Sequence, residues 1–252
     1  MMQRLLISCL ACGIAMAQTP GGATSGIGSE TGAAPGTALP PSGKPLPKMS
    51  NGKPDLSGTW VWIIRDAAKV DNTPYRPEFL PKVKALAKDY TADPAVHCFL
   101  LGTPRVTAWG FLPFKIVQSP KETIILYEAM RTFRDIPTDG RGHSRDLDNT
   151  FMGESIGHWE QDTLIVDTIG FNDKTWLDVG GKIHSEDLHV VERYSPTADG
   201  RIHYEAVAED PKMFTRPWKV LDGTIGAAPG GDMVSEYECI EGNGDIEHLK
   251  AK

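Results

Sequence analysis

The amino-acid sequence predicts an all-β domain of consecutive antiparallel strands, arranged as an up-and-down barrel or a sandwich. Short runs of β-branched and aromatic residues recur along the chain, and tight polar corners join them. The clearest case is residues 153–171, where two such runs flank the corner Glu160-Gln161-Asp162. A second turn signal is Asp199-Gly200, because Asp-Gly favours two-residue hairpin turns.

Nine segments have the composition and length of strands. In chain order they are residues 59–64, 114–118, 122–135, 154–160, 163–168, 188–194, 201–208, 217–221 and 233–239. One short helix is predicted within residues 79–90, where apolar residues fall at helical spacing between Pro81 and Pro94.

The N-terminus predicts export. Residues 1–17 have the form of a signal peptide, with the single charge of Arg4, a short apolar run and the small-x-small site Ala15-Met16-Ala17. Lipidation is the alternative, because Leu6-Ile7-Ser8-Cys9 partly matches a lipobox. The apolar run is too short to span a bilayer as a helix. We therefore expect a secreted or periplasmic protein without stable membrane insertion.

A change of composition separates a linker from the folded domain. Residues 18–50 are dominated by Gly, Ala, Pro, Ser and Thr and cannot bury enough apolar surface to offset their ordering entropy. We expect a flexible linker there and a single barrel domain over residues 51–252, a length sufficient for one core. The net charge is -7 and the basic residues are scattered, so no nucleic-acid partner is expected.

Removal of the signal peptide would leave two cysteines, Cys98 and Cys239. An even pair in an exported chain most simply forms a disulfide, which here would close a very long loop. Two unrelated buried thiols are the alternative.

Six segments carry a family resemblance. They are residues 54–60 (PDLSGTW), 139–143 (DGRGH), 153–159 (GESIGHW), 162–167 (DTLIVD), 184–186 (HSE) and 192–194 (ERY). Together they resemble a large family of exported, mostly uncharacterised proteins that is abundant in acidobacteria and related soil bacteria. That family usually has glycine where this chain has Gln161. The resemblance implies export and an all-β fold, and it names no activity.

A second, shorter resemblance concerns the first strand. Gly58-Thr59-Trp60 is similar to the Gly-x-Trp of lipocalins, in which the tryptophan closes one end of an eight-stranded barrel. Together with the strand pattern and the expected export, it favours a calycin-like (lipocalin-like) up-and-down β-barrel. An open sandwich remains the alternative.

The longest predicted strand, residues 122–135, carries charges on both faces. Alternate residues of a strand face opposite sides, so we expect Glu128 or Arg131 to point into the interior. A buried charge needs a partner, which predicts either a structural Glu–Arg pair or the polar floor of a ligand pocket. Arg134 on the same strand could also fix a ligand.

Two loops offer further candidates. Arg141 and His143 lie in a loop that could line a barrel mouth, or could simply be solvated and held by Asp–Arg pairs. Trp176 lies in a Gly- and Asp-rich loop, where an exposed ring would contact a ligand; a place in the core is the alternative.

His184 and Glu186 would share one face of an extended segment. A carboxylate beside an imidazole raises its basicity and suits it to proton transfer, although a structural role at a strand end is the alternative. A metal site needs three or more convergent ligands, which this spacing does not supply. We expect no metal and no cofactor.

These residues support three competing functions. The favoured one is a barrel that binds a small, largely apolar molecule in its interior. The expected ligand-binding residues are Arg131, Arg134, Arg141, His143 and Trp176. The second is a cofactor-independent isomerase, lyase or cyclase that uses His184, Glu186 and Glu128 as acid–base groups. The third is a carbohydrate-contacting module built on exposed tryptophans. The sequence does not decide whether the protein is an enzyme.

Overall fold

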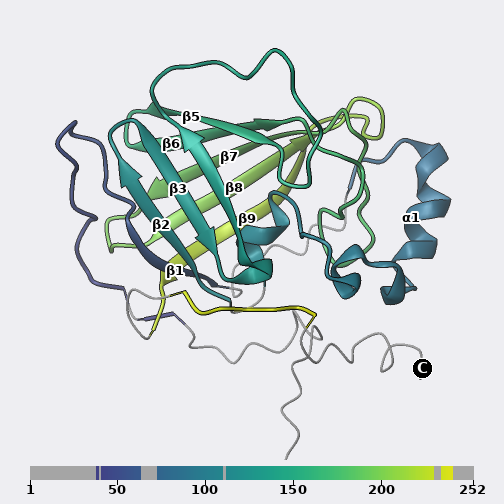
Figure 1. Ribbon diagram of the computed structural model, residues 1–252, viewed down its shortest axis with the longest axis horizontal. Coiled ribbons are helices and arrows are strands. Elements are labelled where there is room, and N and C mark those ends of the chain that lie inside the picture. Colours follow the sequence, from purple (N-terminus) through teal and green to yellow (C-terminus); the bar gives the residue numbers. More distant parts are fainter. Residues whose placement is uncertain (1–37, 40, 64–72, 110–111, 230–233, 241–252) are drawn as a thin grey trace, which may run out of the picture.

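In the computed structural model, residues 38–39, 41–63, 73–109, 112–229 and 234–240 are described. Within them, nine strands form one antiparallel sheet that curls into a nearly closed barrel (Figure 1). The all-β prediction, with one short helix, is therefore confirmed. Within the same parts of the chain, no helix combines the length and apolar character needed to cross a membrane.

The sheet runs in the order β4-β3-β2-β1-β9-β8-β7-β6-β5. Its strands are β1 Gly58–Ile63, β2 Phe114–Ser119, β3 Glu122–Tyr127, β4 Thr132–Pro137, β5 Glu154–Glu160, β6 Thr163–Ile169, β7 His189–Pro196, β8 Ile202–Glu209 and β9 Trp218–Ala227. The helix α1 is Leu80–Leu86, and short 3-10 turns cover Pro77–Phe79, Tyr90–Ala92, Pro94–His97, Arg105–Ala108 and Ala129–Arg131. The two edge strands, β4 and β5, lie beside each other and form the seam of the barrel.

The prediction of one continuous strand over residues 122–135 is wrong. The chain reverses between β3 and β4, and Met130 and Arg131 adopt the left-handed φ values 55° and 46°. A strand cannot continue through that conformation. Glu128 and Arg131 therefore lie at the turn and do not face the interior, whereas Arg134 does, with an exposed fraction of 3%.

The last predicted strand is also wrong, since residues 234–238 form none. The strand before it, β9, is longer than predicted and ends at Ala227, six residues beyond the expected end at Leu221. The disulfide between Cys98 and Cys239 is present, as predicted, and joins this C-terminal segment to the chain after the turn Pro94–His97.

Inward-facing side chains of the strands fill the barrel. Trp60 belongs to the main core cluster, and its indole donates a hydrogen bond to the carbonyl oxygen of Leu56 at 2.9 Å. A second hydrophobic cluster joins α1 and the loops to the start of β9. It includes Val83 of α1 and Trp218 of β9. Trp176 belongs to this cluster with 4% of its surface exposed, so its expected exposure on a loop is wrong.

The N-terminal segments are described only in part. The predicted signal peptide and residues 18–37 of the expected linker lie outside the described residues. The end of that linker contacts the barrel: the Ser42 hydroxyl donates to the carbonyl oxygen of Asp199 at 3.2 Å, and the Leu39 amide donates to that of Ala227.

Candidate functional site

A pocket of about 380 Å³ opens at the seam between β4 and β5. Its lining combines apolar, polar and charged side chains from both edge strands and from the loop between them. The lining residues are Phe133, Arg134, Asp135, Pro137, Arg141, Gly142, Ser144, Met152, Gly153, Glu154, Ser155 and Ile156. The volume lies within the range of sites for small molecules, whereas the lining is more polar than that of most such sites.

A buried ion pair lies at the inner end of this pocket. Arg134 donates two hydrogen bonds to the Glu192 carboxylate, one of them 2.9 Å long from Nη1 to Oε1. The exposed fractions of the two side chains are 2% and 0%. Burial alone would lower the pKa of Arg134, but the Glu192 carboxylate raises it well above the ordinary value. Arg134 therefore stays protonated in the interior.

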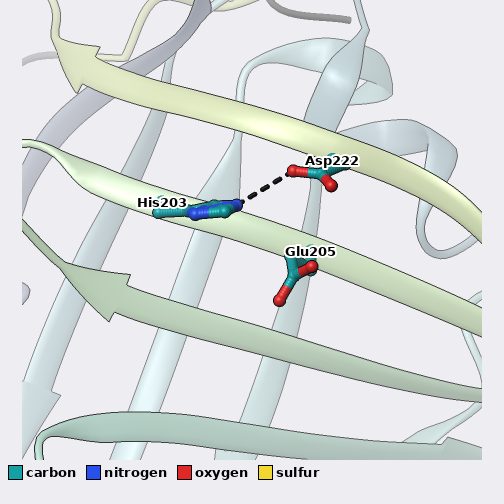
Figure 2. A group of neighbouring side chains, drawn as sticks. All are labelled: His203, Glu205 and Asp222. Carbon is teal, nitrogen blue, oxygen red and sulfur yellow. Dashed lines mark hydrogen bonds and ion pairs between the residues drawn. The ribbon is translucent and has the colours of Figure 1, made fainter. Parts of the chain in front are cut away.

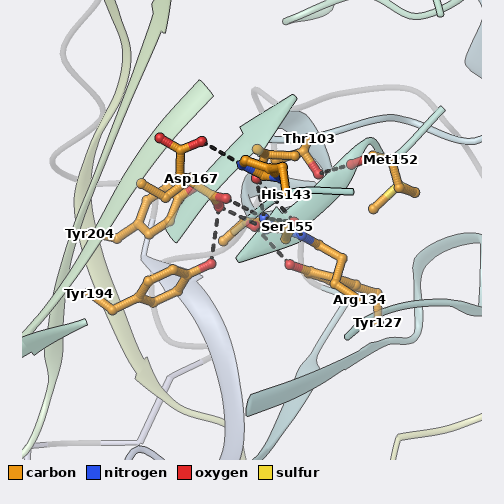
Figure 3. Close-up of polar contacts among 12 residues, drawn as sticks. Thr103, Tyr127, Arg134, His143, Met152, Ser155, Asp167, Tyr194 and Tyr204 are labelled. Atoms are coloured by element: carbon orange, nitrogen blue, oxygen red, sulfur yellow. Dashed lines mark hydrogen bonds and ion pairs between the residues drawn. The ribbon is translucent and has the colours of Figure 1, made fainter. Parts of the chain in front are cut away.

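Tyrosine hydroxyls complete the surroundings of Glu192. Tyr204 and Tyr194 both donate to its Oε1, at 2.7 and 3.1 Å. Burial raises the pKa of each tyrosine well above the ordinary value, so both keep their protons and act as donors. In Figure 3, Tyr127 and Tyr194 point toward the same centre as Arg134. The middle of the barrel is thus occupied by protein groups that satisfy one another.

Ser155 connects this centre to the pocket. Its Oγ accepts a hydrogen bond from Nη2 of Arg134 at 2.9 Å and lies 3.0 Å from Oγ1 of Thr168. Thr168 Oγ1 also accepts from Arg134, so the two hydroxyls share a single mutual hydrogen bond and one hydroxyl proton is left over. Because Ser155 lines the pocket, that proton can be donated to an acceptor group of a ligand there.

The loop between β4 and β5 forms one wall of the pocket and is tied down through His143. The ring lies between two carboxylates, with Nδ1 at 3.1 Å from Glu154 and Nε2 at 2.8 Å from Asp167. Figure 3 shows the contact with Asp167. The neighbouring Ser144 also donates to Glu154 from its amide, at 2.7 Å, and from its hydroxyl. Burial opposes ionisation of Glu154, but these bonds from Ser144 lower its pKa overall.

Asp167 is shared between two histidines. His189 on β7 contacts its second oxygen at 2.9 Å. This hydrogen bond lowers the pKa of Asp167 and raises the pKa of His189. A row of alternating carboxylates and imidazoles therefore runs from the pocket wall across β6 to β7.

Three other predicted residues have protein partners. Arg141 lines the pocket and pairs with Asp139, which matches the alternative of a loop held by an Asp–Arg pair. Glu128 accepts a hydrogen bond from the amide of Ser235 at 2.8 Å. Arg131 forms ion pairs with Glu236 and Glu238. Glu128 and Arg131 thus anchor the C-terminal segment, and the expectation that one of them lines the interior is wrong.

His184 and Glu186 do not form the predicted pair among the described contacts. His184 Nδ1 donates to the carbonyl oxygen of Ser185 at 3.0 Å, so Nε2 accepts from the Thr175 hydroxyl at 2.7 Å. Burial lowers the pKa of His184, which keeps the ring neutral. Glu186 is exposed, and neither residue lines the seam pocket. Ser185 instead anchors the segment, donating from its amide and hydroxyl to buried Asp210.

A further cluster of possible metal ligands lies on the outer face of β8 and β9. His203, Glu205 and Asp222 each bring one ligand atom within 4.8 Å of the others (Figure 2). His203 Nε2 already contacts Asp222 at 2.9 Å, and Lys219 forms ion pairs with both carboxylates. Lys219 offsets one of the two negative charges and occupies both carboxylates, and a cation could bind only after Lys219 had moved away.

Glu192, Ser155 and Asp167, which define the site, are not among the site residues predicted from the sequence. One signal was available for Glu192. Its neighbours at alternate positions, Val190 and Tyr194, are apolar or aromatic, which places the charge on the inward face of β7. No comparable pattern marked Ser155 or Asp167.

No family model, curated protein or solved structure matches this chain.

Proposed function

We propose that the protein binds a small, largely apolar molecule in the seam pocket, with a polar end of the ligand directed toward Ser155 and Arg134. The main support for this proposal is the pocket itself. It extends from Phe133, which is 64% exposed, to the buried polar side chains of Arg134 and Ser155. Exposed aromatic surface beside a polar floor suits an amphipathic compound. The disulfide is in keeping with an oxidising, extracytoplasmic compartment, and we propose export on that ground.

The charges favour a ligand whose polar end is neutral. Arg134 is paired with Glu192, and Arg141 with Asp139, so neither guanidinium has a free charge for an anion. When Thr168 donates the mutual hydrogen bond, the hydroxyl proton of Ser155 is the donor for a carbonyl, hydroxyl or ether oxygen. The ligand therefore need not replace any ion pair when it binds.

An acid–base enzyme in the same pocket is the second candidate. Glu154 lines the pocket and contacts His143, which supplies a carboxylate–imidazole pair in place of the expected His184 and Glu186. Trp176 is buried and cannot contact a carbohydrate at the surface, so the hypothesis of a carbohydrate-contacting module is not favoured.

The experiment is mass spectrometry of an organic extract from residues 18–252, purified from an exporting host. We expect a stoichiometric compound that is lost in Phe133→Ser, since this removes the aromatic wall of the pocket. The matched control is Val117→Ser on β2, where the side chain is 45% exposed but is outside the pocket lining. An empty wild-type extract, or equal retention by both variants, would contradict the proposal.

The same material separates binding from turnover. Once the compound is identified, it is incubated with the wild type and with His143→Gln, and its mass is followed. A binding protein leaves the compound unchanged. An acid–base enzyme converts it, and His143→Gln slows the conversion by about 10²-fold or more.

A further inference from the structure

His143 occupies an unusual place between two acceptors. Both of its ring nitrogens face carboxylates, Glu154 on β5 and Asp167 on β6. Carboxylate oxygens at these distances accept hydrogen bonds, so both nitrogens must donate. A neutral imidazole has only one N–H group. Only the doubly protonated ring satisfies this geometry.

The loop that carries His143 is also the wall of the seam pocket. Arg141, Gly142 and Ser144 all line the pocket, and they flank His143 in the chain. The loop residues themselves are largely exposed: Asp148, Asn149 and the 144–146 segment all face solvent. Its attachment to the barrel thus depends strongly on the contacts of His143 and of its neighbour Ser144 with Glu154.

We propose that His143 is a proton-operated latch that holds the wall of the seam pocket closed when the ring is charged and releases it when the ring is neutral. In the charged state, two charge-assisted hydrogen bonds fix the loop to β5 and β6. After loss of one proton, a nitrogen lone pair faces a carboxylate, and one of the two contacts becomes repulsive. This inference rests on the proposed function only in treating the wall as part of a ligand site.

Charged or titratable groups from several strands face the latch. The charged or titratable groups facing it are Glu154 from β5, Asp167 from β6, His189 from β7 and, through His189, Glu209 from β8, while Asp139 and Arg141 in its own loop pair with each other. The pKa values of Glu154 and Asp167 are lowered, so both remain ionised well into the acid range. The latch is therefore closed in mildly acidic solution and opens as the pH rises.

His189 acts in the same direction. Its pKa is raised by the hydrogen bond to Asp167, so its stabilising contribution is full below its unfolded pKa. The contribution is lost as the pH rises through the folded value. Alkaline pH thus weakens both histidine contacts to Asp167 together.

The test is hydrogen exchange of the whole protein at pH 5.5 and 8.5, expressed as protection factors so that the intrinsic pH effect cancels. We expect protection of residues 138–150 to fall about tenfold between the two values, as one charge-assisted hydrogen bond would give. His143→Gln should show the low protection at both values. The matched control is His158→Gln, an exposed histidine on β5 that contacts the single carboxylate of Glu160.

A second measurement keeps the inference testable if His143→Gln fails to fold. The nitrogen chemical shifts of the wild-type His143 ring should show two protonated nitrogens at pH 5.5 and one at pH 8.5. A neutral ring at pH 5.5, or equal protection of residues 138–150 at both pH values, overturns the latch. Neither readout involves a ligand, so failure of the latch and failure of ligand binding are distinguished.

Discussion

The substitution Glu192→Gln tests the energetic role of the buried pair. Gln keeps the shape of the side chain and an acceptor oxygen for Tyr194 and Tyr204, but it removes the charge that faces Arg134. Breaking a buried pair from one side leaves an uncompensated charge and costs about 3–5 kcal/mol. Since whole domains are stable by only about 5–15 kcal/mol, this is a large share of the total.

The expected effect is measurable by thermal and guanidinium unfolding, followed by tryptophan fluorescence. For a domain of this size, each kcal/mol lowers Tm by roughly 2–4 °C, so Glu192→Gln should melt roughly 6–20 °C below the wild type. The control is Glu160→Gln, which removes the same charge from an exposed pair with Arg193. That change should leave Tm nearly unchanged, because solvent screens an exposed pair.

Equal stability losses for Glu192→Gln and Glu160→Gln would refute the reasoning, since burial would then make no difference. The double variant Arg134→Met/Glu192→Leu provides a further check. It removes both charges, leaves the tyrosine hydroxyls without their acceptor, at about 1–3 kcal/mol each, and deprives Ser155 and Thr168 of their donor. The loss of stability in the double variant should therefore be smaller than the sum of the losses measured for Arg134→Met and Glu192→Leu separately.

Two further substitutions test the packing of the barrel and its C-terminal attachment. Replacing Cys98 and Cys239 by serine should lower the free energy of unfolding by about 2–5 kcal/mol, because the bridge spans 141 residues of sequence; an unchanged urea midpoint would contradict this. Gly223→Ala would place a Cβ 2.7 Å from the ring carbons of Trp62 and should cost about 1–3 kcal/mol by overpacking. The control is Gly142→Ala, where a Cβ would meet nothing within 4 Å, and it should leave Tm nearly unchanged. Equal Tm values for the two variants would show that the Trp62 ring moves aside at no cost in stability.

The strand spacing was largely predictable because apolar and polar residues alternate with period two on each wall of the barrel. The failure at residues 122–135 has a local cause. The turn between β3 and β4 consists of Glu128, Ala129, Met130 and Arg131, without the Gly, Pro, Asn or Asp that marks most turns. Two residues with side chains adopt the left-handed conformation, which composition does not predict.

The site was less predictable than the strands because it depends on barrel closure. Alternation alone indicates that Glu192 faces inward, but not which cation it meets. Arg134 is 58 residues away in sequence, on a strand at the edge of the sheet. The cysteine pair was predictable for the opposite reason: after removal of the signal peptide, only one pairing remains.

The Arg134 interactions also explain why the pocket lies at the seam. Elsewhere in the barrel, neighbouring strands are joined by backbone ladders, but the described strand pairs include none between β4 and β5. Arg134 on β4 instead donates to Ser155 on β5 and, across the interior, to Glu192 on β7. Side-chain contacts thus bridge the two edge strands where no backbone ladder joins them, and the pocket opens at that place.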